Sequence, residues 1–209
     1  VPVLKSNAYG HGLVEIASIL DTVEAPFFCV NSFYEAYTLW KNGIKTSIHI
    51  MGYVDPLDLQ TEKLPFSYTT YNYTQLEAIN RYQKGAQVHI FVDTGMHREG
   101  FRLEALPLLL KNIKQFDNIH ITGLMSHLAM GDKIDNTLTE KQFNTFKKAQ
   151  NIVREYGIVP QWEHILNSPG LLNLAQSGKP AIGNIARVGK AIYGIDPRGQ
   201  NSNLRPILT

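Results

Sequence analysis

The amino-acid sequence predicts an α/β fold, a (β/α)8 barrel of the TIM type. Three observations support this prediction. Short apolar runs rich in β-branched and aromatic residues recur along the chain, segments with helical spacing separate them, and eight such runs fit within 209 residues. Strands that alternate with helices indicate a parallel sheet covered by helices, and about 200 residues is enough for the smallest barrels of this type.

The predicted strands all have strand length and a buried character. In chain order they are Val1–Lys5, Phe27–Val30, Ser47–Met51, Phe66–Thr69, Val88–Asp93, Ile119–His127, Glu163–Asn167 and Ala186–Tyr193. A doubly wound open sheet is the alternative fold, and it would place a glycine-rich phosphate turn after the first strand. The segment Asn7–Gly12 follows the first strand and does not read GxGxxG, so we favour the barrel.

Helical spacing is clearest in two of the intervening segments. Apolar residues three or four apart share one face over Leu103–Phe116 and again over Phe143–Tyr156. Thr139 with Gln142 resembles a capping box for the second segment, and Gly157 stands where a helix C-cap would fall.

Composition and charge exclude several classes of protein. The chain has 20 Lys and Arg against 18 Asp and Glu, with no basic run, so a nucleic-acid surface is not expected. Cys29 is the only cysteine, which excludes an intrachain disulfide and a CxxC zinc site. No apolar run approaches the roughly 18 residues of a membrane span, and no signal-peptide pattern is present. We expect a cytoplasmic protein without a metal, and no membrane contact through this segment.

The two ends of the chain suggest a piece of something longer. The sequence opens on Val1 inside a predicted strand, and its last stretch is rich in Gly, Asn and Pro. We therefore expect residues 1–197 to form a barrel truncated at both ends. Residues 198–209 would begin a linker toward a C-terminal β domain that the chain lacks.

Polar residues stand at the C-terminal ends of the predicted strands, where barrels carry their active sites. In chain order they are Lys5, the run Asp93–Arg98, Ser126 with His127, His164, Asn167 with Ser168, and Arg187 with Gly189. Each residue alone has an ordinary structural explanation, such as a surface lysine, a buried histidine or a helix cap. Their shared placement at one end of successive strands predicts a single site.

The chemistry of these residues admits a pyridoxal 5′-phosphate (PLP) site. A lysine inside a barrel is costly unless its pKa falls or its amine forms an imine, as it does with an aldehyde cofactor. Ser168 before a helical segment and Gly189 after a strand start would offer a hydroxyl and a backbone N–H to a phosphate. Loops after the seventh and eighth strands often hold phosphate in such barrels.

Five motifs occur in order over nearly the whole chain. They are KSNAYGHG at Lys5–Gly12, DTGMHR at Asp93–Arg98, Ser126-His127, HILNS at His164–Ser168, and RVGKAIYG at Arg187–Gly194. The first closely resembles the PLP-attachment motif of alanine racemases, and the other four resemble further signatures of that family. The resemblance implies interconversion of L- and D-alanine by two-base α-proton exchange, a homodimer, and a role in supplying D-alanine for peptidoglycan.

The resemblance implies catalytic roles for Lys5, Arg187 and His127. Lys5 would form the internal aldimine and act as the base on one face of the substrate. Arg187 would face the pyridine nitrogen, and because arginine is effectively never deprotonated it would disfavour protonation there and weaken the ring as an electron sink. His127 would lie against the ring and bond Arg187, with His164 behind it.

The remaining cofactor contacts also come from the resemblance. Tyr9, Ser168 and the backbone at Gly189 and Lys190 would hold the phosphate, Arg98 would contact the phenolic oxygen of PLP, and Asn167 would complete the cofactor-binding set.

The sequence departs from the family pattern at several positions. Phe91 stands where many members have a lysine that becomes carbamylated and orients the arginine that matches Arg98. Ser126 replaces a threonine, and Lys190 replaces an apolar residue. The second base of the family is a tyrosine from the C-terminal domain of the partner subunit, and none of the ten tyrosines here matches its motif. We therefore expect this chain alone to be nearly inactive.

Other functions stay open on the sequence. A serine or broad-specificity racemase shares these motifs. A PLP-dependent decarboxylase or a PLP carrier shares the barrel and the lysine, although Arg187 argues against the first and the run Asn7–Gly12 against the second. A barrel without a cofactor would leave the motifs unexplained.

Overall fold

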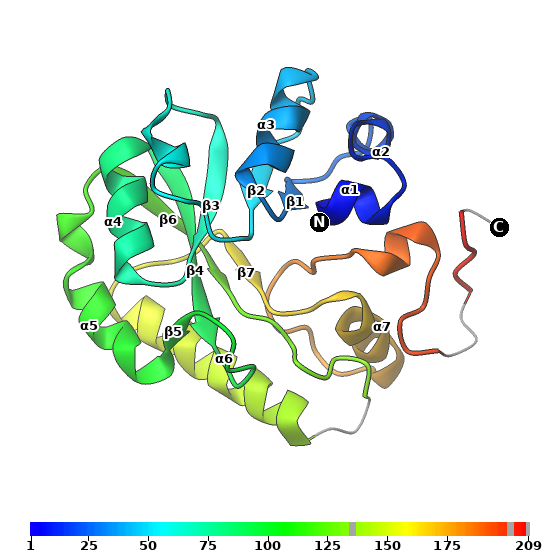
Figure 1. The fold of residues 1–209 in the computed structure, drawn as a ribbon. Coiled ribbons are helices and arrows are strands. Elements are labelled where there is room, and N and C mark those ends of the chain that lie inside the picture. The colour runs from blue at the N-terminus through cyan, green and yellow to red at the C-terminus, as the bar shows by residue number, and fades with distance from the viewer. Residues whose placement is uncertain (134–136, 200–202, 208–209) are drawn as a thin grey trace.

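The computed structural model describes residues 1–133, 137–199 and 203–207. Its parallel strands form one curved sheet in the order β1-β2-β3-β4-β6-β7, with helices on the outside (Figure 1). The strands are β1 (Phe28–Val30), β2 (Ile48–Ile50), β3 (Phe66–Thr70), β4 (Ala86–Asp93), β6 (Ile119–Met125) and β7 (Trp162–His164). A two-residue strand, β5 (Phe101–Arg102), pairs with the end of β4 outside this order.

Isolated parallel bridges close the ring of strands. Val3 pairs with Cys29 in β1, and Pro2 pairs with Val188. The N–H of Arg187 donates to the carbonyl of Leu166, just beyond β7, at 3.0 Å. The parallel α/β barrel predicted from the sequence is therefore confirmed, and it is truncated in that its first and last members are single bridges.

Two predicted strands are correspondingly shorter than expected. The strand predicted at Val1–Lys5 ends before Lys5, which begins a helical turn, α1 (Lys5–Tyr9). The strand predicted at Ala186–Tyr193 gives way to a 3-10 helix, η4 (Lys190–Tyr193). Both turns lie at the mouth of the barrel, where Lys5 and Lys190 line the cavity described below.

The helices lie between consecutive strands and cover the outside of the barrel (Figure 1). They are α2 (Leu13–Leu20), α3 (Phe33–Lys41), α4 (Tyr73–Tyr82), α5 (Leu106–Lys111), α6 (Thr137–Glu155) and α7 (Ser168–Ser177), with further 3-10 turns η1 (Asp58–Gln60), η2 (Leu103–Ala105) and η3 (Ile113–Gln115). Side-chain caps begin several of them. Ser32 and Glu35 form a reciprocal capping box at α3, and Asn72 caps α4.

Two helix predictions need correction. The segment Leu103–Phe116 is broken into η2, α5 and η3, and the side chain of Asn112 bonds the carbonyl of Leu108 where α5 ends. Thr139 and Gln142 are not a capping box, because both lie within α6. Thr139 bonds the carbonyl of Met130 instead. Gly157 does end the preceding helix as expected, with φ 77°.

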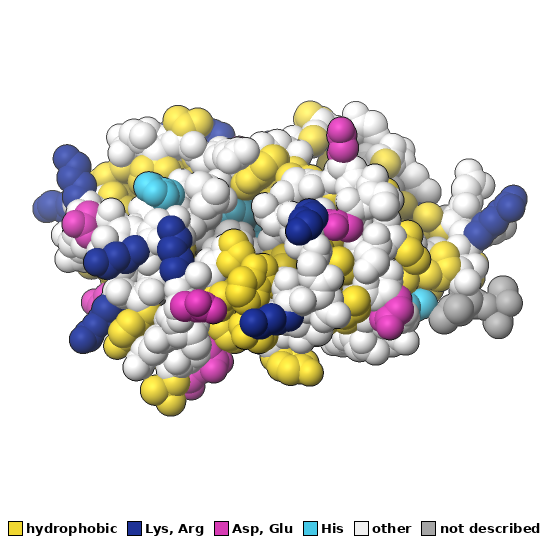
Figure 2. All heavy atoms as spheres, turned by 90° about the horizontal axis from the view of Figure 1, so that it is seen from above, with side chains coloured by type: hydrophobic (Ala, Val, Ile, Leu, Met, Phe, Trp, Pro, Cys, Tyr) yellow, Lys and Arg dark blue, Asp and Glu magenta, His cyan; other side chains and the backbone are white. Residues whose placement is uncertain are grey.

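The apolar core lies between the strands and the outer helices, while the inside of the barrel is partly polar. Three histidines from β2, β4 and β7 are fully buried there, namely His49, His89 and His164. On the face seen in Figure 2, acidic and basic side chains are interspersed rather than gathered by sign. Within the described ranges, no helix has the length and apolarity needed to cross a membrane.

Candidate active site

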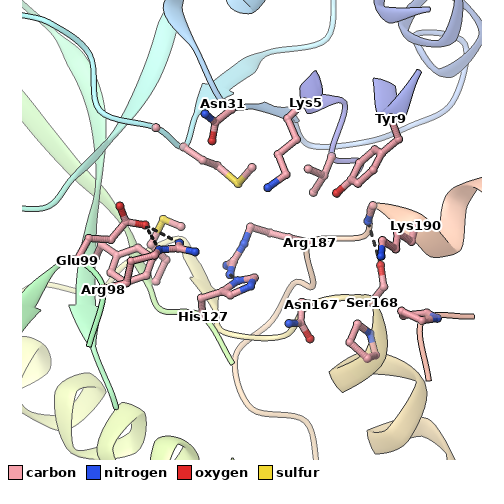
Figure 3. A pocket seen from close by; sticks show the side chains of 18 of the residues that line it. Lys5, Tyr9, Asn31, Arg98, Glu99, His127, Asn167, Ser168, Arg187 and Lys190 are labelled. Atoms are coloured by element: carbon pink, nitrogen blue, oxygen red, sulfur yellow. Dashed lines mark hydrogen bonds and ion pairs between the residues drawn. The ribbon is translucent and has the colours of Figure 1, made fainter. Parts of the chain in front are cut away.

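A cavity of about 560 Å³ opens at the carboxyl ends of the strands. All nine residues predicted to bind the cofactor line it, and they come from both ends of the chain (Figure 3). They are Lys5, Tyr9, Arg98, His127, Asn167, Ser168, Arg187, Gly189 and Lys190. His164 does not line the cavity but lies buried and bonds Arg187.

The turn α1 is left-handed and holds Lys5 at its start. Ser6–Tyr9 all have φ between 52° and 57°, a conformation that costs non-glycine residues about 1–2 kcal/mol each. The carboxylate of Glu35 accepts the backbone N–H of Ser6 at 2.6 Å and helps to fix the turn. Lys5 and Tyr9 both point into the cavity (Figure 3). Strain of this kind is tolerated where it positions functional groups.

Hydroxyl and amide groups converge at one edge of the cavity. The hydroxyl of Ser168, the first residue of α7, accepts the N–H of Gly189 at 3.0 Å. The Tyr9 hydroxyl lies so close to Gly189 that a Cβ there would collide with it. Glu99 is the acidic side chain among the cavity residues, and it lies on the opposite side (Figure 3). A helix N-terminus with hydroxyls, and with no carboxylate beside it among the described residues that line the cavity, suits a phosphate group.

The side chain of Asn167 caps α7 and joins it to the loop after β6. Its Oδ1 accepts the N–H of Gly170 at 3.1 Å, and its Nδ2 donates to the carbonyl of Leu128 at 3.3 Å. Asn167 therefore holds the helix end that carries Ser168.

Arg187 carries a buried positive charge with neutral partners. Its guanidinium donates to Nδ1 and the carbonyl of His164 at 2.6 and 3.1 Å, to the carbonyl of Ser126 at 2.6 Å, and to Nδ1 of His127 at 3.0 Å. Among the described residues no carboxylate bonds it. Burial lowers its pKa to about 10, so Arg187 is cationic at neutral pH.

His127 is neutral and has one defined tautomer. Burial first, and then the charge of Arg187, lower its pKa to about 3. Because a guanidinium only donates hydrogen bonds, Nδ1 of His127 accepts and the proton sits on Nε2. Gln142 braces the backbone here, donating to the carbonyl of His127 at 2.8 Å. His127 thus orients Arg187, and at neutral pH its ring is neutral and carries only the Nε2 proton.

Arg98 reaches the cavity from a loop shaped by Asp93. One oxygen of the Asp93 carboxylate accepts three successive backbone N–H groups, those of residues 95 to 97, each at 3.0 Å. Arg98 Nε then donates to the carboxylate of Glu99 at 3.0 Å. Phe91, where a lysine was expected, is buried against Tyr71 with ring centroids 5.1 Å apart. Glu99, which the motifs did not single out, is therefore the anion that orients Arg98.

Further lining residues follow the strands β1, β2 and β3. Asn31 comes after β1, Met51 and Tyr53 after β2, and Tyr71 after β3. The same rule of strand ends that found Lys5 would have found them, had it been applied to residues outside the five motifs. The buried His49 and His89 carry no comparable signal, because alternating strand residues predict burial but not partners.

The barrel and its cavity define a cofactor-binding domain with a lysine at the carboxyl end of the first strand. The family model for the N-terminal domain of alanine racemase matches residues 1–197, and the chain belongs to this family. The family is PLP-dependent, and the lysine, the buried arginine and the phosphate-compatible edge fit that cofactor.

Known proteins resemble the chain in sequence and in structure. An alanine racemase from Sorangium cellulosum is 31% identical over 216 residues, which cover 99% of this chain and 56% of that protein. One from Streptococcus suis is 33% identical over 202 residues, 95% of this chain and 53% of that protein. The chain thus spans about half the length of the curated relatives it matches.

Solved structures of alanine racemases are similar to this chain over nearly its whole length. Alanine racemase from Clostridium difficile 630 superposes with a TM-score of 0.89 at 27% identity, covering 98% of this chain and 55% of that one. The enzyme from E. faecalis gives a TM-score of 0.83 at 30% identity, with 98% and 56% covered. These relatives are named as racemases, not as decarboxylases or carriers.

Proposed function

We propose that this chain is the barrel half of a PLP-dependent racemase that interconverts L- and D-alanine. The observation that carries the proposal is the convergence of Lys5, Arg187 and the edge formed by Tyr9, Ser168 and Gly189 on one cavity. The names of the relatives support the reaction and the substrate. We further propose that the full-length protein is a cytoplasmic homodimer whose product supplies peptidoglycan synthesis.

The lining residues divide the cavity into three parts for PLP. Tyr9, Ser168 and the N–H groups at Gly189 and Lys190 would hold the phosphate, and Arg187 would face the ring nitrogen. Lys5 would lie at the aldehyde end. When bound, PLP supplies an aldehyde that amines attack and a ring that withdraws electron density from the substrate α-carbon.

Lys5 is the base that this chain provides. Its half-buried amine points into the cavity and would take or return the α-proton on one face of the substrate. Arg187 stays charged and, facing the ring nitrogen of bound PLP, would disfavour a proton there, which would limit electron withdrawal and favour simple proton exchange. Arg98, held by Glu99, would contact the phenolic oxygen on the far side of the ring.

The opposite face of the substrate needs a second base, and two tyrosines that line this cavity, Tyr9 and Tyr71, are poorly suited to it. Burial raises the pKa of both Tyr9 and Tyr71, and the Tyr71 hydroxyl donates to the carbonyl of Met51. We propose that the base is a tyrosine from a C-terminal β domain of the partner subunit. Residues 198–209 would begin the linker to that domain, with 200–202 and 208–209 outside the described residues.

Lys5→Ala tests the proposed function. The full-length protein incubated with PLP should show visible absorbance from a lysine–PLP linkage, and borohydride should fix the cofactor to Lys5. Lys5→Ala should lose both signals together with racemisation, whereas Lys111→Ala, an exposed lysine of α5, should keep them.

Two outcomes would contradict the proposed function. One is a wild-type protein that binds no PLP while circular dichroism shows it folded. The other is release of CO₂ from alanine without exchange between its D and L forms. In the isolated 209-residue chain we expect PLP binding with little racemisation, and robust racemisation there would overturn the assignment of the second base.

A further inference from the structure

A column of buried histidines runs through the inside of the barrel to Arg187. The rings of His49 and His89 stack with centroids 4.1 Å apart. Nδ1 of His89 lies 2.9 Å from Nε2 of His164, and Nδ1 of His164 lies 2.6 Å from the Arg187 guanidinium. His49 is fixed at the far end by the hydroxyls of Ser67 and Thr69, each at 2.9 Å. Neither His49 nor His89 lines the cavity.

The chemistry of arginine gives this column one direction. A guanidinium has donors and no acceptor, so Nδ1 of His164 must be unprotonated and its proton must sit on Nε2. That N–H then donates to Nδ1 of His89, which must also be unprotonated. A proton added at either Nδ1 would point at another donor. The rings of His164 and His89 therefore each turn an unprotonated Nδ1 toward the donor before them in the column, and these hydrogen bonds run from Arg187 toward His89.

The backbone makes room for the His89 ring. The pairing of β4 with β6 shifts by one residue between Val88 and His89, so that His89 lies opposite Gly123. A Cβ on Gly123 would collide with the His89 ring. Bulges of this kind re-aim side chains next to active sites. Two separate features, an irregular register and a glycine, thus direct the His89 side chain toward His164.

We propose that His89 is a positioning residue for Arg187 that acts through His164. By accepting from His164 Nε2, it adds to the preference that Arg187 imposes and stabilises the tautomer whose Nδ1 receives the guanidinium. This lets the barrel hold a buried cation with neutral partners and keep it directed at the cavity. The consequence for the cofactor ring rests on the proposed function, whereas the tautomer of His164 is a property of this chain alone.

The first test measures that tautomer in the full-length protein without cofactor. Long-range ¹H–¹⁵N spectra of ¹⁵N-histidine protein separate the two tautomers, and His164→Gln assigns the signal. We expect His164 with its proton on Nε2 in the wild type and in His89→Gln, whose amide oxygen can accept the same bond. In His89→Leu, and in Gly123→Ala where the ring is displaced, we expect a mixture of tautomers. A wild-type signal protonated on Nδ1 overturns the proposal.

The second test follows PLP. His89→Leu leaves a buried donor without an acceptor, so we expect PLP affinity to fall roughly tenfold and the absorbance of the lysine–PLP linkage to titrate at a different pH. His89→Gln should restore both properties. His120→Leu, an exposed histidine of β6, is the matched control and should resemble the wild type.

The outcomes separate this inference from the proposed function. If the protein binds no PLP, the proposed function fails. The tautomer of His164, measured without cofactor, still tests whether His89 positions Arg187. If His89→Leu does not fold, Gly123→Ala takes its place, and a wild-type tautomer and wild-type PLP titration in that variant overturn the proposal. A His89→Leu protein with the wild-type tautomer and wild-type PLP titration shows that His89 only fills space, and overturns the proposal.

Discussion

At the residue scale, the charged side chains of this site differ in the partners that hold them. Arg187 is 4% exposed, yet imidazole nitrogens and carbonyl oxygens receive its hydrogen bonds. A buried charge of this kind is costly unless its donors are all accepted. On the other side of the cavity the carboxylate of Glu99 accepts from Arg98, so this arginine has an acidic partner.

Glu99→Gln separates orientation from stability at the residue scale. An exposed ion pair contributes only about 0–1 kcal/mol to folding, so the melting temperature should hardly change. Without the carboxylate, however, the Arg98 guanidinium loses its fixed orientation, and we expect kcat/KM for alanine to fall roughly tenfold. Glu104→Gln, an exposed neighbour in η2, is the control. Equal kinetics in both variants would show that Glu99 does not orient Arg98.

Two short elements, the turn α1 and the N-terminus of α7, place side chains in the cavity through their local backbone geometry. The left-handed turn α1 brings Lys5 and Tyr9 to the same side, although they are four residues apart. The N-terminus of α7 supplies Ser168 and is set by the Asn167 cap. In both elements the feature that stabilises the backbone also places a side chain that lines the cavity.

Asn167→Ala tests this double role at the scale of the element. Loss of an N-cap costs about 1 kcal/mol of stability, and here it also frees the helix end that carries Ser168. We expect a lower unfolding midpoint in urea and weaker PLP binding. Asn72→Ala removes the equivalent cap of α4 at a residue that does not itself line the cavity, and should lower stability without changing PLP affinity. If both variants bind PLP equally well, Asn167 acts only as a cap.

At the scale of the whole molecule, the barrel encloses four histidines that cannot easily be charged. Burial lowers the pKa of His89 and His127 to about 3 and that of His49 and His164 well below the ordinary value. The native state keeps these rings neutral, while an unfolded chain protonates them below about pH 6.5. Their contribution to stability is therefore complete above pH 6.5 and is lost as pH falls toward 3.

Urea denaturation at pH 7 and pH 5 measures this effect. As pH falls below about 6.5, each neutral buried histidine should lower the free energy of unfolding by up to about 1.4 kcal/mol per pH unit. His89→Gln removes one such group and should weaken the pH dependence, whereas His120→Gln, on an exposed position, should not. Equal unfolding midpoints at pH 5 and pH 7 would contradict a neutral histidine column.

The order of strands, most helices and the principal residues of the cavity could be predicted from the sequence. Strand runs are recognisable because burial on both faces selects β-branched and aromatic residues. Lys5, His127 and Arg187 could be placed together because parallel strands end at one edge of a barrel. The helix at Leu103–Phe116 was predicted as continuous because spacing reports which face is buried but not where a polar side chain interrupts the backbone.

The sequence by itself determined the class of fold and the set of residues that meet at its mouth, since both follow from local periodicity and strand order. Only the tertiary structure decided how those residues are held. The left-handed turn at Lys5, the pairing of Arg98 with Glu99 and the histidine column depend on contacts that local patterns do not encode. His89 and His164 are 75 positions apart in the chain, and only closure of the barrel brings their nitrogens within hydrogen-bond distance.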